Sequence, residues 1–459
     1  MIWRPNGRGE VAGAAQSVIP AKAAIHERGG QRLLAGTPLH GSRVNPGMTD
    51  RDGEGLPSPP ATRMHPRMAE VQAQEPGLSH EVAGSRLTLL ADGPQRLSAL
   101  LDLIEGAKES LRFLYYMFMD DSSGTRVRDA LIVAARRGVT VSVLVDGFGS
   151  TANREFFRPL EAAGIAFCRF SPKFGRRYLL RNHQKLALAD GERVIIGGFN
   201  VSDDYFGTVE SGSWRDIGLR VEGDSVDCLT RYFDNLFQWT QAPDARVRDM
   251  RRLLQQSSVT RGRLHWLFGG PSRRLSPWAR AVRRDMRSAR RLDLVAAYFA
   301  PSFGMLRRLS GISRRGGEVR VVTASKSDNN ATIAAARNTY WWLLRRGVEI
   351  FEYRPTKLHT KLFVVGDVVH IGSANFDMRS LFLNLEMMLR IDDAPFAAAM
   401  RRFVDGEVAS SEPITLESHG RNRTLLNRLR WAVGYFIVAV ADYRIAKRLN
   451  FKDVGLPRP

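Results

Sequence analysis

The sequence contains one order of predicted strands and helices twice, and this internal repeat constrains the fold more than any other feature. Elements are expected over residues 87–90, 94–110, 111–119, 125–137 and 139–145 in the first copy, and over residues 290–295, 319–323, 331–346 and 348–350 in the second. Gly138 and Gly347 directly follow two of the helices, as is typical of helix ends. Strands that alternate with helices favour parallel or mixed sheets covered on both faces. We therefore expect two related α/β units, offset by about 170–180 residues.

The N-terminal part differs in composition from the rest. Residues 1–80 are rich in glycine, proline, arginine and serine and show no sustained period, which indicates a disordered extension. A start codon chosen too far upstream would also explain them, with Met64 or Met68 as the true start. Organised sequence is expected to begin near Ser85. The expected parts of the chain are an extension over residues 1–80, domains over residues 85–250 and 265–415, and a C-terminal segment over residues 420–452.

The charge of the chain narrows the class of its partners. Lysine and arginine outnumber acidic residues by 68 to 47, so the formal net charge is +21. This favours nucleic acid, a phosphorylated molecule or an anionic lipid surface as partner, although a generally basic proteome would give the same excess. The two cysteines, Cys168 and Cys228, provide no disulfide framework, which favours a reducing compartment. No apolar run approaches the ~20 residues of a spanning helix, and no signal peptide is expected.

A more specific signal recurs in both copies. His183 and Lys185 stand two residues apart on a predicted strand, which places both side chains on one face, and a Gly-x-x-Asn segment ending at Asn200 follows. The same pattern returns at His359, Lys361 and Asn375. A single His-x-Lys is usually a solvated strand edge, and a single Gly-x-x-Asn is usually a turn. Two copies that are 359 − 183 = 176 residues apart, within a repeated unit, favour a functional site.

These residues resemble the phospholipase D superfamily, whose mark is His-x-Lys-x4-Asp twice in one chain. The resemblance covers residues 85–410 and is strongest to the bacterial cardiolipin synthases. Supporting segments are Tyr115-Tyr116, Asp120-Asp121, Asp146–Ser150, Arg181–His183, Tyr298–Pro301, Ser327-Asp328, Gly372–Ser380 and Asn384–Glu386. The resemblance implies an α/β fold of two duplicated phospholipase D-like α-β-α sandwich domains. They would be related by a pseudo-twofold axis, with the active site at their interface.

The second motif departs from the superfamily pattern. Asp190 lies seven residues after His183, but Gly366 lies seven residues after His359, and Asp367 follows it. From histidine to asparagine the second copy is also one residue shorter, 375 − 359 = 16 against 200 − 183 = 17. A hairpin turn rearranged at Gly366 and Asp367 would explain both differences. We include Asp190 and Asp367 among the residues of the catalytic motif. The role that we expect for the aspartate of this motif is structural.

The two motifs contain what metal-free cleavage of a phosphodiester requires, which is a nucleophile, a proton donor and cations at the phosphoryl oxygens. We expect His183 to attack phosphorus and His359 to act as acid and base, although the near-symmetry leaves the reverse order open. The expected cations and phosphate ligands are Lys185, Lys361, Asn200, Asn375 and Ser373. We expect no metal and no cofactor, because the other seven histidines show no metal-ligand spacing.

Two carboxylates occupy matched positions in the copies. A catalytic imidazole needs an acceptor that holds its tautomer. Residues 219–221 and 389–391 are predicted to be equivalent strands, and Asp216 and Glu386 stand three residues before them. This match favours their acting as partners of the two histidines. The alternative is a pair of surface acids near the starts of strands.

The C-terminal segment combines apolar residues with cations. Residues 431–441 are apolar apart from Gly434, and the flanking cations are Arg421, Arg423, Arg428, Arg430, Arg444, Lys447 and Arg448. The run has about half of the ~20 residues that would span a bilayer, so it suits the interface of an anionic leaflet. A helix packed on the domain is the alternative. Arg176, Arg177 and Arg181 would either meet lipid head groups or be solvated.

The resemblance implies transfer of a phosphatidyl group from one phosphatidylglycerol to another, which forms cardiolipin and releases glycerol. The expected partners are anionic phospholipids and a membrane surface, with no obligate nucleic acid, and the oligomeric state is left open. A phospholipase D hydrolase, a superfamily nuclease and an inactive lipid-binding module are the rival functions. The module is disfavoured, because both His-Lys-Asn sets are complete. The expected location is peripheral, at the cytoplasmic face of a bacterial inner membrane, since the chain lacks the N-terminal transmembrane helices of many family members.

Overall fold

The computed structural model describes residues 78–171, 180–272 and 275–441. The predicted N-terminal extension up to residue 77, with Met64 and Met68, lies outside these ranges, as do Arg176, Arg177 and the cations beyond residue 441. Within the described ranges, no helix is both long enough and apolar enough to cross a membrane.

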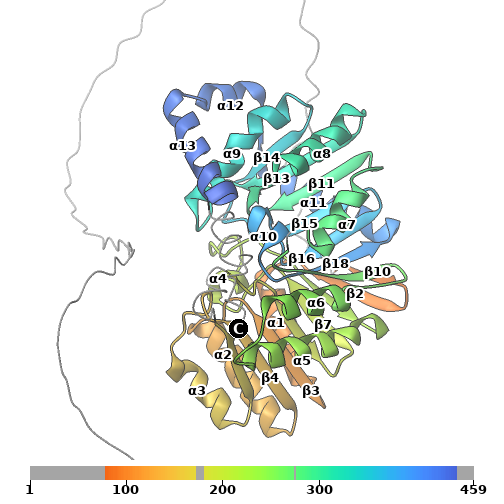
Figure 1. Ribbon diagram of the computed structural model, residues 1–459, viewed down its shortest axis with the longest axis vertical. Coiled ribbons are helices and arrows are strands. Elements are labelled where there is room, and N and C mark those ends of the chain that lie inside the picture. Colours follow the sequence, from red (N-terminus) through yellow and green to blue (C-terminus); the bar gives the residue numbers. More distant parts are fainter. Residues whose placement is uncertain (1–77, 172–179, 273–274, 442–459) are drawn as a thin grey trace, which may run out of the picture. The chain divides into compact units, whose positions relative to one another are not determined.

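Two large sheets form the framework of the described residues (Figure 1). The first has the order β1 (Ser79–Val82), β2 (Ser85–Leu90), β8 (Gly218–Glu222), β7 (Arg193–Gly197), β6 (Leu186–Ala189), β3 (Ser110–Tyr115), β4 (Thr140–Asp146) and β5 (Ala166–Phe170). The second has the order β19 (Ser411–Ile414), β14 (Glu349–Tyr353), β13 (Glu318–Ala324), β11 (Arg291–Ala296), β15 (Lys361–Val365), β16 (Val368–Gly372), β18 (Glu386–Asp392), β10 (Leu264–Gly269) and β9 (Val259–Arg261).

The pairing pattern of the first sheet recurs in the second. Strand β3 pairs in parallel with β4 and antiparallel with β6, as β11 does with β13 and β15. From there the order β6-β7-β8-β2 matches the order β15-β16-β18-β10, and every pair in both runs is antiparallel. A short parallel pair, β12 (Phe299–Ala300) with β17 (Phe376–Asp377), lies apart from the sheets. The predicted duplication and the α/β class are therefore confirmed.

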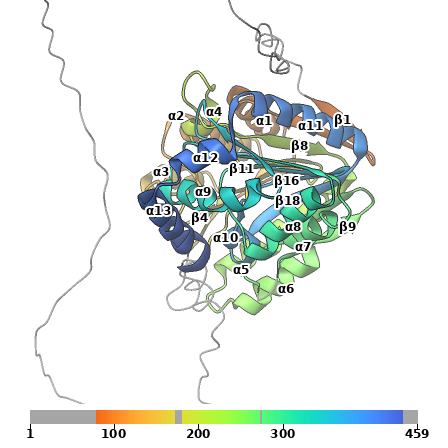
Figure 2. The ribbon, with the colours of Figure 1, turned by 90° about the horizontal axis from the view of Figure 1, so that it is seen from above.

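Helices cover both sheets, as Figures 1 and 2 show. In the first half they are α1 (Gly93–Glu105), α2 (Ser122–Arg136), α3 (Arg154–Ala162), α4 (Asp203–Phe206), α5 (Cys228–Gln241) and α6 (Val247–Ser257). In the second half they are α7 (Pro277–Asp285), α8 (Phe303–Arg314), α9 (Asn330–Leu344), α10 (Met378–Phe382), α11 (Ala394–Ala409), α12 (Leu416–Asn422) and α13 (Leu425–Tyr435).

The apolar cores show how the halves are joined. One core packs α1, α2 and α3 against one face of the first sheet, and a second packs α7, α8 and α9 against one face of the second sheet. A third core combines the remaining faces of both sheets with α5 and α11, so it contains residues of both halves. Burial of apolar surface is the dominant favourable contribution to folding, so this shared core fixes the two halves against each other.

Several predicted boundaries are wrong. Helix α1 ends at Glu105 rather than residue 110, and β3 ends at Tyr115 rather than residue 119. The chain then leaves the sheet, and Phe118 forms an isolated parallel bridge with Val201. Strand β1 begins before the expected start of order near Ser85, and β9 and β10 begin before residue 265. Helices α2 and α9 end at Arg136 and Leu344, one and two residues before the predicted ends, and the glycines that follow them, Gly138 and Gly347, have φ of +94° and +75°.

Candidate active site

The two motif strands begin where the halves exchange backbone hydrogen bonds. Asn182 forms a parallel bridge with Leu385, and Leu358 forms the equivalent bridge with Arg215. The backbone amides of the two motif histidines, which come next in the chain, donate to the carbonyls of Leu385 and Arg215 at 2.9 and 2.7 Å. Each motif is therefore tied to the loop of the opposite half, in a pattern that follows the pseudo-twofold relation.

Each histidine is hydrogen-bonded to a carboxylate of the opposite half. His183 Nδ1 lies 3.1 Å from Glu386 Oε2, and His359 Nδ1 lies 2.6 Å from Asp216 Oδ2. Both carboxylate side chains are fully buried. An ionised carboxylate only accepts hydrogen bonds, so each Nδ1 donates and each Nε2 keeps its lone pair for chemistry. The structure thus brings the predicted carboxylates to the histidines, but across the interface rather than within each copy.

The motif lysines lie beside the histidines. Lys185 Nζ donates to the carbonyl of His183 at 2.6 Å, and Lys361 Nζ donates to the carbonyl of His359. Each lysine is only 1 % exposed. Burial lowers the pKa of Lys361 to about 8, and burial together with the charge of Lys361 lowers the pKa of Lys185 well below its ordinary value. The two lysines are therefore within electrostatic reach of each other in one site.

The imidazoles are neutral in the free protein near pH 7. Burial lowers the pKa of His359 to about 4, and the charges of Lys361 and Lys185 act in the same direction. Burial and both lysines likewise lower the pKa of His183. A Cβ at Gly198, in the first half, would lie 2.8 Å from Lys361 Cδ of the second half, so the two motifs form a single cluster.

The expected phosphate ligands have different surroundings. Asn200 Nδ2 donates to Tyr205 Oη at 3.0 Å, and Asn200 Oδ1 accepts from the Met117 amide at 3.2 Å. Asn375 is 3 % exposed, and its Oδ1 has no hydrogen-bond partner within the described ranges. An amide oxygen only accepts hydrogen bonds, so the group of Asn375 that can donate to a phosphoryl oxygen is its Nδ2.

Ser373 does not have the predicted role. Its Oγ donates to Glu386 Oε2 at 2.5 Å and accepts from the Met387 amide at 3.0 Å, and the residue is 1 % exposed. It therefore holds the carboxylate behind His183. The matching position in the first half is Gly198, where a Cβ would lie 2.5 Å from Asp216 Oδ1. A serine is thus excluded there, because Asp216 takes up its space.

Asp190 and Asp367 are not at the histidines. Asp190 follows the far end of β6, where Oδ1 and Oδ2 accept from the amides of residues 108–110 at 2.8 to 3.2 Å and from Arg193 at 2.8 Å. Asp367 is exposed at the equivalent hairpin. Strands rise ~3.3 Å per residue, so Asp190 lies ~17 Å along the chain from Lys185. Including these aspartates in the catalytic set was wrong, whereas their structural interpretation fits.

The hairpin geometry explains the departure from the motif. The turn between β6 and β7 spans residues 190–192, and the turn between β15 and β16 spans residues 366–367, so the predicted rearrangement is confirmed. Asp190 and Gly366 have φ of +54° and +57°. Glycine adopts this left-handed conformation freely, and aspartate tolerates it. The first position of each turn requires the left-handed backbone conformation, which both aspartate and glycine can adopt.

Aromatic residues that we did not assign surround the imidazoles. The ring of Tyr116 lies 5.1 Å from that of His183, and the rings of Tyr205 and Trp214 lie 5.2 and 5.4 Å from that of His359. Tyr116 belongs to the Tyr115-Tyr116 segment that supported the family resemblance, so the sequence did contain a signal that could have identified it. Tyr205 and Trp214 lie between the first motif and Asp216, and no pattern in the sequence distinguishes them.

A buried aspartate positions the segment before the first motif. Asp146, at the end of β4, accepts from the amides of Phe148, Gly149 and Asn182 at 2.9, 3.0 and 2.7 Å.

Within the described ranges, no group of three or more histidine, cysteine or acidic side chains has the arrangement of a metal site. In the second half, Tyr298 Oη donates to Asp328 Oδ1 at 2.6 Å.

Comparisons with known proteins identify the family. The family model described as cardiolipin synthase, PLD-like domain, matches residues 100–237 and 282–406, which is more than half of the chain. Cardiolipin synthase 1 of Bacillus anthracis is 35% identical over 318 residues, which cover 65% of this chain and 62% of that protein. Cardiolipin synthase 1 of Bacillus cereus is 32% identical over 361 residues, which cover 74% of this chain and 70% of that protein. The match to the Bacillus anthracis relative thus spans a little under two thirds of its length.

A solved structure supports the fold. The crystal structure of phosphatidylserine synthase from Haemophilus influenzae is similar with a TM-score of 0.64 at 13% sequence identity, and the match covers 82% of this chain and 97% of that chain. This likeness shows a common fold. Together with the family match, it establishes that the chain belongs to the phospholipase D-like family of the cardiolipin synthases.

Proposed function

We propose that the protein is a phosphatidyltransferase of the cardiolipin synthase type, which joins two phosphatidylglycerol molecules and releases glycerol. One observation carries the proposal. Two imidazoles, each held by a carboxylate of the opposite half, lie in one cluster with two buried lysines. Such a cluster contains a nucleophile, an acid and base, and fixed positive charge for the oxygens of a phosphodiester.

The first step forms a covalent intermediate. Nε2 of His183 attacks phosphorus, the bond from phosphorus to the glycerol oxygen breaks, and this oxygen takes the proton from Nε2 of His359. The protonated His359 is stabilised by the Asp216 carboxylate. Burial and then the charges of Lys361 and Lys185 lower the pKa of His359 in the free protein, and these charges are offset when the phosphodiester anion binds beside them. Substrate binding therefore favours the protonated form that the step requires.

The second step transfers the group to the acceptor. Nε2 of His359 removes the proton from a hydroxyl group of the second phosphatidylglycerol while the hydroxyl oxygen attacks phosphorus. The bond from phosphorus to His183 breaks, and the electron pair returns to the imidazole. The site is then restored, because His359 again carries the proton that the next cycle uses.

The hydrogen bonds of the two carboxylates support this assignment of roles. Glu386 shares its charge with two serine hydroxyls, from Ser373 and Ser380 at 2.5 and 2.8 Å. The Asp216 carboxylate accepts from His359 and from the adjacent backbone amide, the charges of Lys361 and Arg96 also act on it, and its hydrogen bond to the imidazole is the shorter one. A shorter hydrogen bond to a carboxylate stabilises an imidazolium better, so the histidine beside Asp216 suits the proton-carrying role.

Lipid analysis separates this function from its rivals. We expect a cardiolipin-deficient bacterial strain that expresses the protein to accumulate cardiolipin on thin-layer chromatography. Phosphatidic acid as the sole new product would identify a hydrolase that uses water as acceptor. DNA cleavage without a change in lipids would identify a nuclease, and no change of either kind would identify an inactive module. A matched strain that expresses the His265→Ala variant serves as a positive control, because this histidine lies in β10 outside the cluster.

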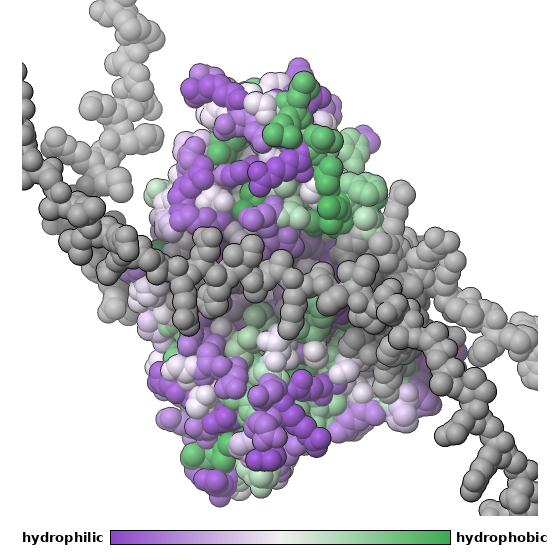
Figure 3. Space-filling view, turned by 90° about the vertical axis from the view of Figure 1, so that its left-hand side faces the viewer, coloured by the Kyte–Doolittle hydropathy of each residue, from purple (hydrophilic) through white to green (hydrophobic). Residues whose placement is uncertain are grey.

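The C-terminal helix presents an apolar face that suits a membrane surface. Trp431, expected at the interface, is only 6 % exposed and stacks on His419, and Gly434 allows close packing on α9. The exposed apolar residues are instead Leu425, Leu426, Leu429, Val433, Phe436 and Ile437. They form a green strip at the upper right of Figure 3. The alternative of a helix packed on the domain therefore holds for one face of α13, and we propose that the other face meets the membrane. The proposed location is the cytoplasmic face of the inner membrane, reached through this strip.

Substitution of the exposed leucines tests membrane contact. We expect a variant with Leu425→Gln, Leu426→Gln and Leu429→Gln to bind phosphatidylglycerol vesicles about 100-fold more weakly in sedimentation, since each leucine loses a favourable transfer from water. The thermal midpoint should stay the same, because these side chains are exposed. Val133→Gln, at an exposed apolar position of α2, is the control. Unchanged vesicle binding by the triple variant would contradict a role of α13 at the membrane.

A further inference from the structure

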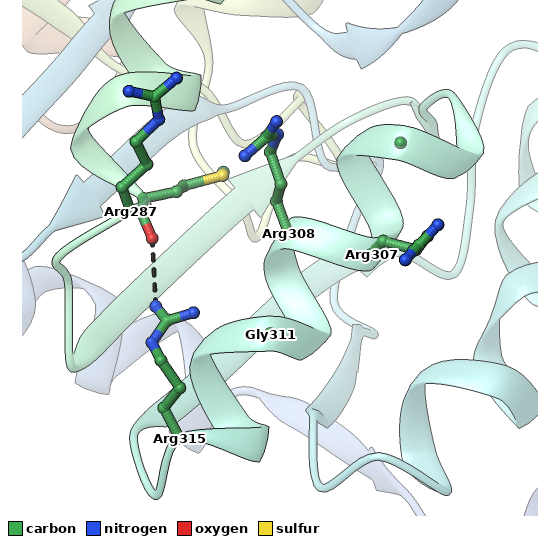
Figure 4. A pocket seen from close by; sticks show the side chains of 7 residues that line it. Arg287, Arg307, Arg308, Gly311 and Arg315 are labelled. Carbon is green, nitrogen blue, oxygen red and sulfur yellow. Dashed lines mark hydrogen bonds between the residues drawn. The ribbon is translucent and has the colours of Figure 1, made fainter.

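Arginine side chains line a hollow between α7 and α8, far along the chain from both motifs. The hollow has a volume of about 420 Å³, and its lining residues are Met286, Arg287, Gly304, Arg307, Arg308, Gly311 and Arg315. Figure 4 shows the Arg308 side chain extending toward Arg287, whereas the Arg307 side chain points to the other side. Arg315 is fixed, because its Nη2 donates to the Met286 carbonyl at 3.3 Å. The hollow is thus a cavity with a fixed wall, and several positively charged side chains line it.

The spacing along α8 keeps this place open. Gly304, Arg308, Gly311 and Arg315 follow one another at intervals of four, three and four residues, so they share one face of the helix. A Cβ at Gly304 would meet only Ser302, at 3.9 Å. The two glycines therefore leave space between the arginines, where larger side chains would fill the hollow.

The positive charges have no carboxylate partner. Among the described residues, Arg283, Arg287, Arg307 and Arg308 take part in none of the ion pairs, although other arginines form many. Burial, and then the neighbouring Arg283 and Arg287, lowers the pKa of Arg308. Like charges that are gathered without a counter-charge repel one another, and an anion that binds among them relieves this repulsion.

The nearby acids are committed elsewhere. Residues 280–315 contain ten arginines but only two acids, Asp285 and Asp293. Asp285 bonds to His370 and Arg390, both at 2.9 Å, and Asp293 bonds to Arg320 at 2.5 Å. Neither carboxylate is available to the hollow. The excess of positive charge at α7 and α8 is therefore a property of the folded surface and not only of the composition.

The surface next to the hollow indicates which anion binds. A second hollow lies between α8 and α9, and its lining residues are Arg314, Trp341, Trp342, Arg345 and Arg346. Phe303 is 57 % exposed and packs its ring 5.4 Å from that of Trp342. Trp341 also lines a third hollow, together with Leu425 and Leu429 of α13. Arginine, then aromatic and then leucine side chains thus follow one another from α7 to α13.

This order matches a lipid interface better than a dissolved ligand. Tryptophan is enriched at the head-group level of membranes, and arginine near a surface attracts anionic lipids. The leucine face of α13 offers nothing to a nucleic acid or to free phosphate. We propose that the hollow of Arg287, Arg307 and Arg308 binds the phosphate of an anionic phospholipid head group outside the active site and so anchors the second half to the bilayer. This proposal rests on the proposed function, since it assumes that the enzyme acts at a phospholipid surface.

Vesicle binding by a charge-neutral variant tests the anchor. The variant carries Arg287→Gln, Arg307→Gln and Arg308→Gln in the full chain, and the control carries Arg126→Gln, Arg136→Gln and Arg154→Gln on α2 and α3, which removes the same charge. We expect binding to phosphatidylglycerol–phosphatidylcholine vesicles to fall about 100-fold in the variant, because each arginine near such a surface contributes about a factor of five. The control should change by less than about threefold. Equal losses in both would overturn the proposal, since binding would then follow net charge alone.

Two further measurements separate the outcomes. Transfer activity in detergent micelles should be unchanged in the variant, because these arginines lie outside the histidine cluster. If wild-type protein lacked transferase activity but the vesicle difference remained, the proposed function would fail and the lipid site would stand. If activity were normal and the variant bound vesicles like wild type, the site would fail and the function would stand. Calorimetry with inorganic phosphate completes the test, since arginine-dependent binding of phosphate without any vesicle effect would overturn the lipid assignment.

Discussion

Replacement of His183 by alanine is expected to lower phosphatidyl transfer by about 10⁴-fold or more, because in the proposed cycle His183 forms the covalent bond to phosphorus while His359 transfers the proton. The side chain is mostly buried, so the thermal midpoint must be compared with that of wild type. The measurement is transfer of a labelled phosphatidyl group between phosphatidylglycerol molecules in mixed micelles. Activity within about tenfold of wild type would contradict the assignment of His183 as nucleophile.

Replacement of His359 by alanine should give a loss of similar size but of a different kind. The glycerol oxygen needs a proton to leave, whereas a p-nitrophenolate group leaves without one. A phosphodiester with that leaving group should therefore still react with His183 in the His359→Ala variant. Because the base for the second step is missing, the product should be a stoichiometric burst and a stable phosphohistidine.

The comparison of the two variants decides their roles. No burst is expected from His183→Ala with the activated substrate, and His265→Ala should behave like wild type with both substrates. A burst from His183→Ala and none from His359→Ala would reverse the assignment. Bursts from both variants would show that neither imidazole is the nucleophile, and the proposed mechanism would then be wrong.

The sequence predicted the repeated architecture well because the signals were local. Strand and helix periods, the glycines after α2 and α9, and the paired motifs all depend on residues close in the chain. The same holds for the shorter hairpin of the second copy, which follows from counting residues. At Asp190 and Gly366 the backbone conformation determines which residue is accepted. The residue type in the motif therefore predicts little there, because aspartate and glycine both adopt the same positive φ.

The site contacts that span the two halves could not be predicted in this way. Asp216 and Glu386 were identified from their matched positions, but their exchange between halves depends on packing in the shared core. Ser373 has a polar side chain in a glycine-rich segment, which suggested a phosphate ligand. Only the structure shows that its hydroxyl is committed to Glu386. Tyr205 and Trp214 approach His359 through the fold of one loop, and that conformation leaves no periodic signal.

The two carboxylates should differ when their charge is removed, and Asp216→Asn should have the larger effect. An amide in place of Asp216 no longer stabilises the imidazolium of His359, and it can present a donor to Nδ1. We expect transfer to fall by about 10³–10⁴-fold, as for other histidines that lose the charge of an aspartate partner. Glu386→Gln should cost only about 10–100-fold, since Nε2 of His183 takes up no proton in the proposed cycle and the carboxylate already shares its charge with two serines.

A substrate with a better leaving group again shows whether a variant has lost proton transfer to the leaving group or nucleophilic attack on phosphorus. For Asp216→Asn, the p-nitrophenyl substrate should restore most of the first step, because protonation by His359 is no longer required. For Glu386→Gln it should restore little, because the defect lies in the nucleophile. Asp285→Asn is a matched control, since Asp285 forms a buried pair with His370 at 2.9 Å outside the cluster. It should lower stability and leave transfer intact. Equal losses for Asp216→Asn and Glu386→Gln, both insensitive to the leaving group, would mean that the carboxylates only hold the fold, and the division of roles between the two histidines would then lose its structural basis.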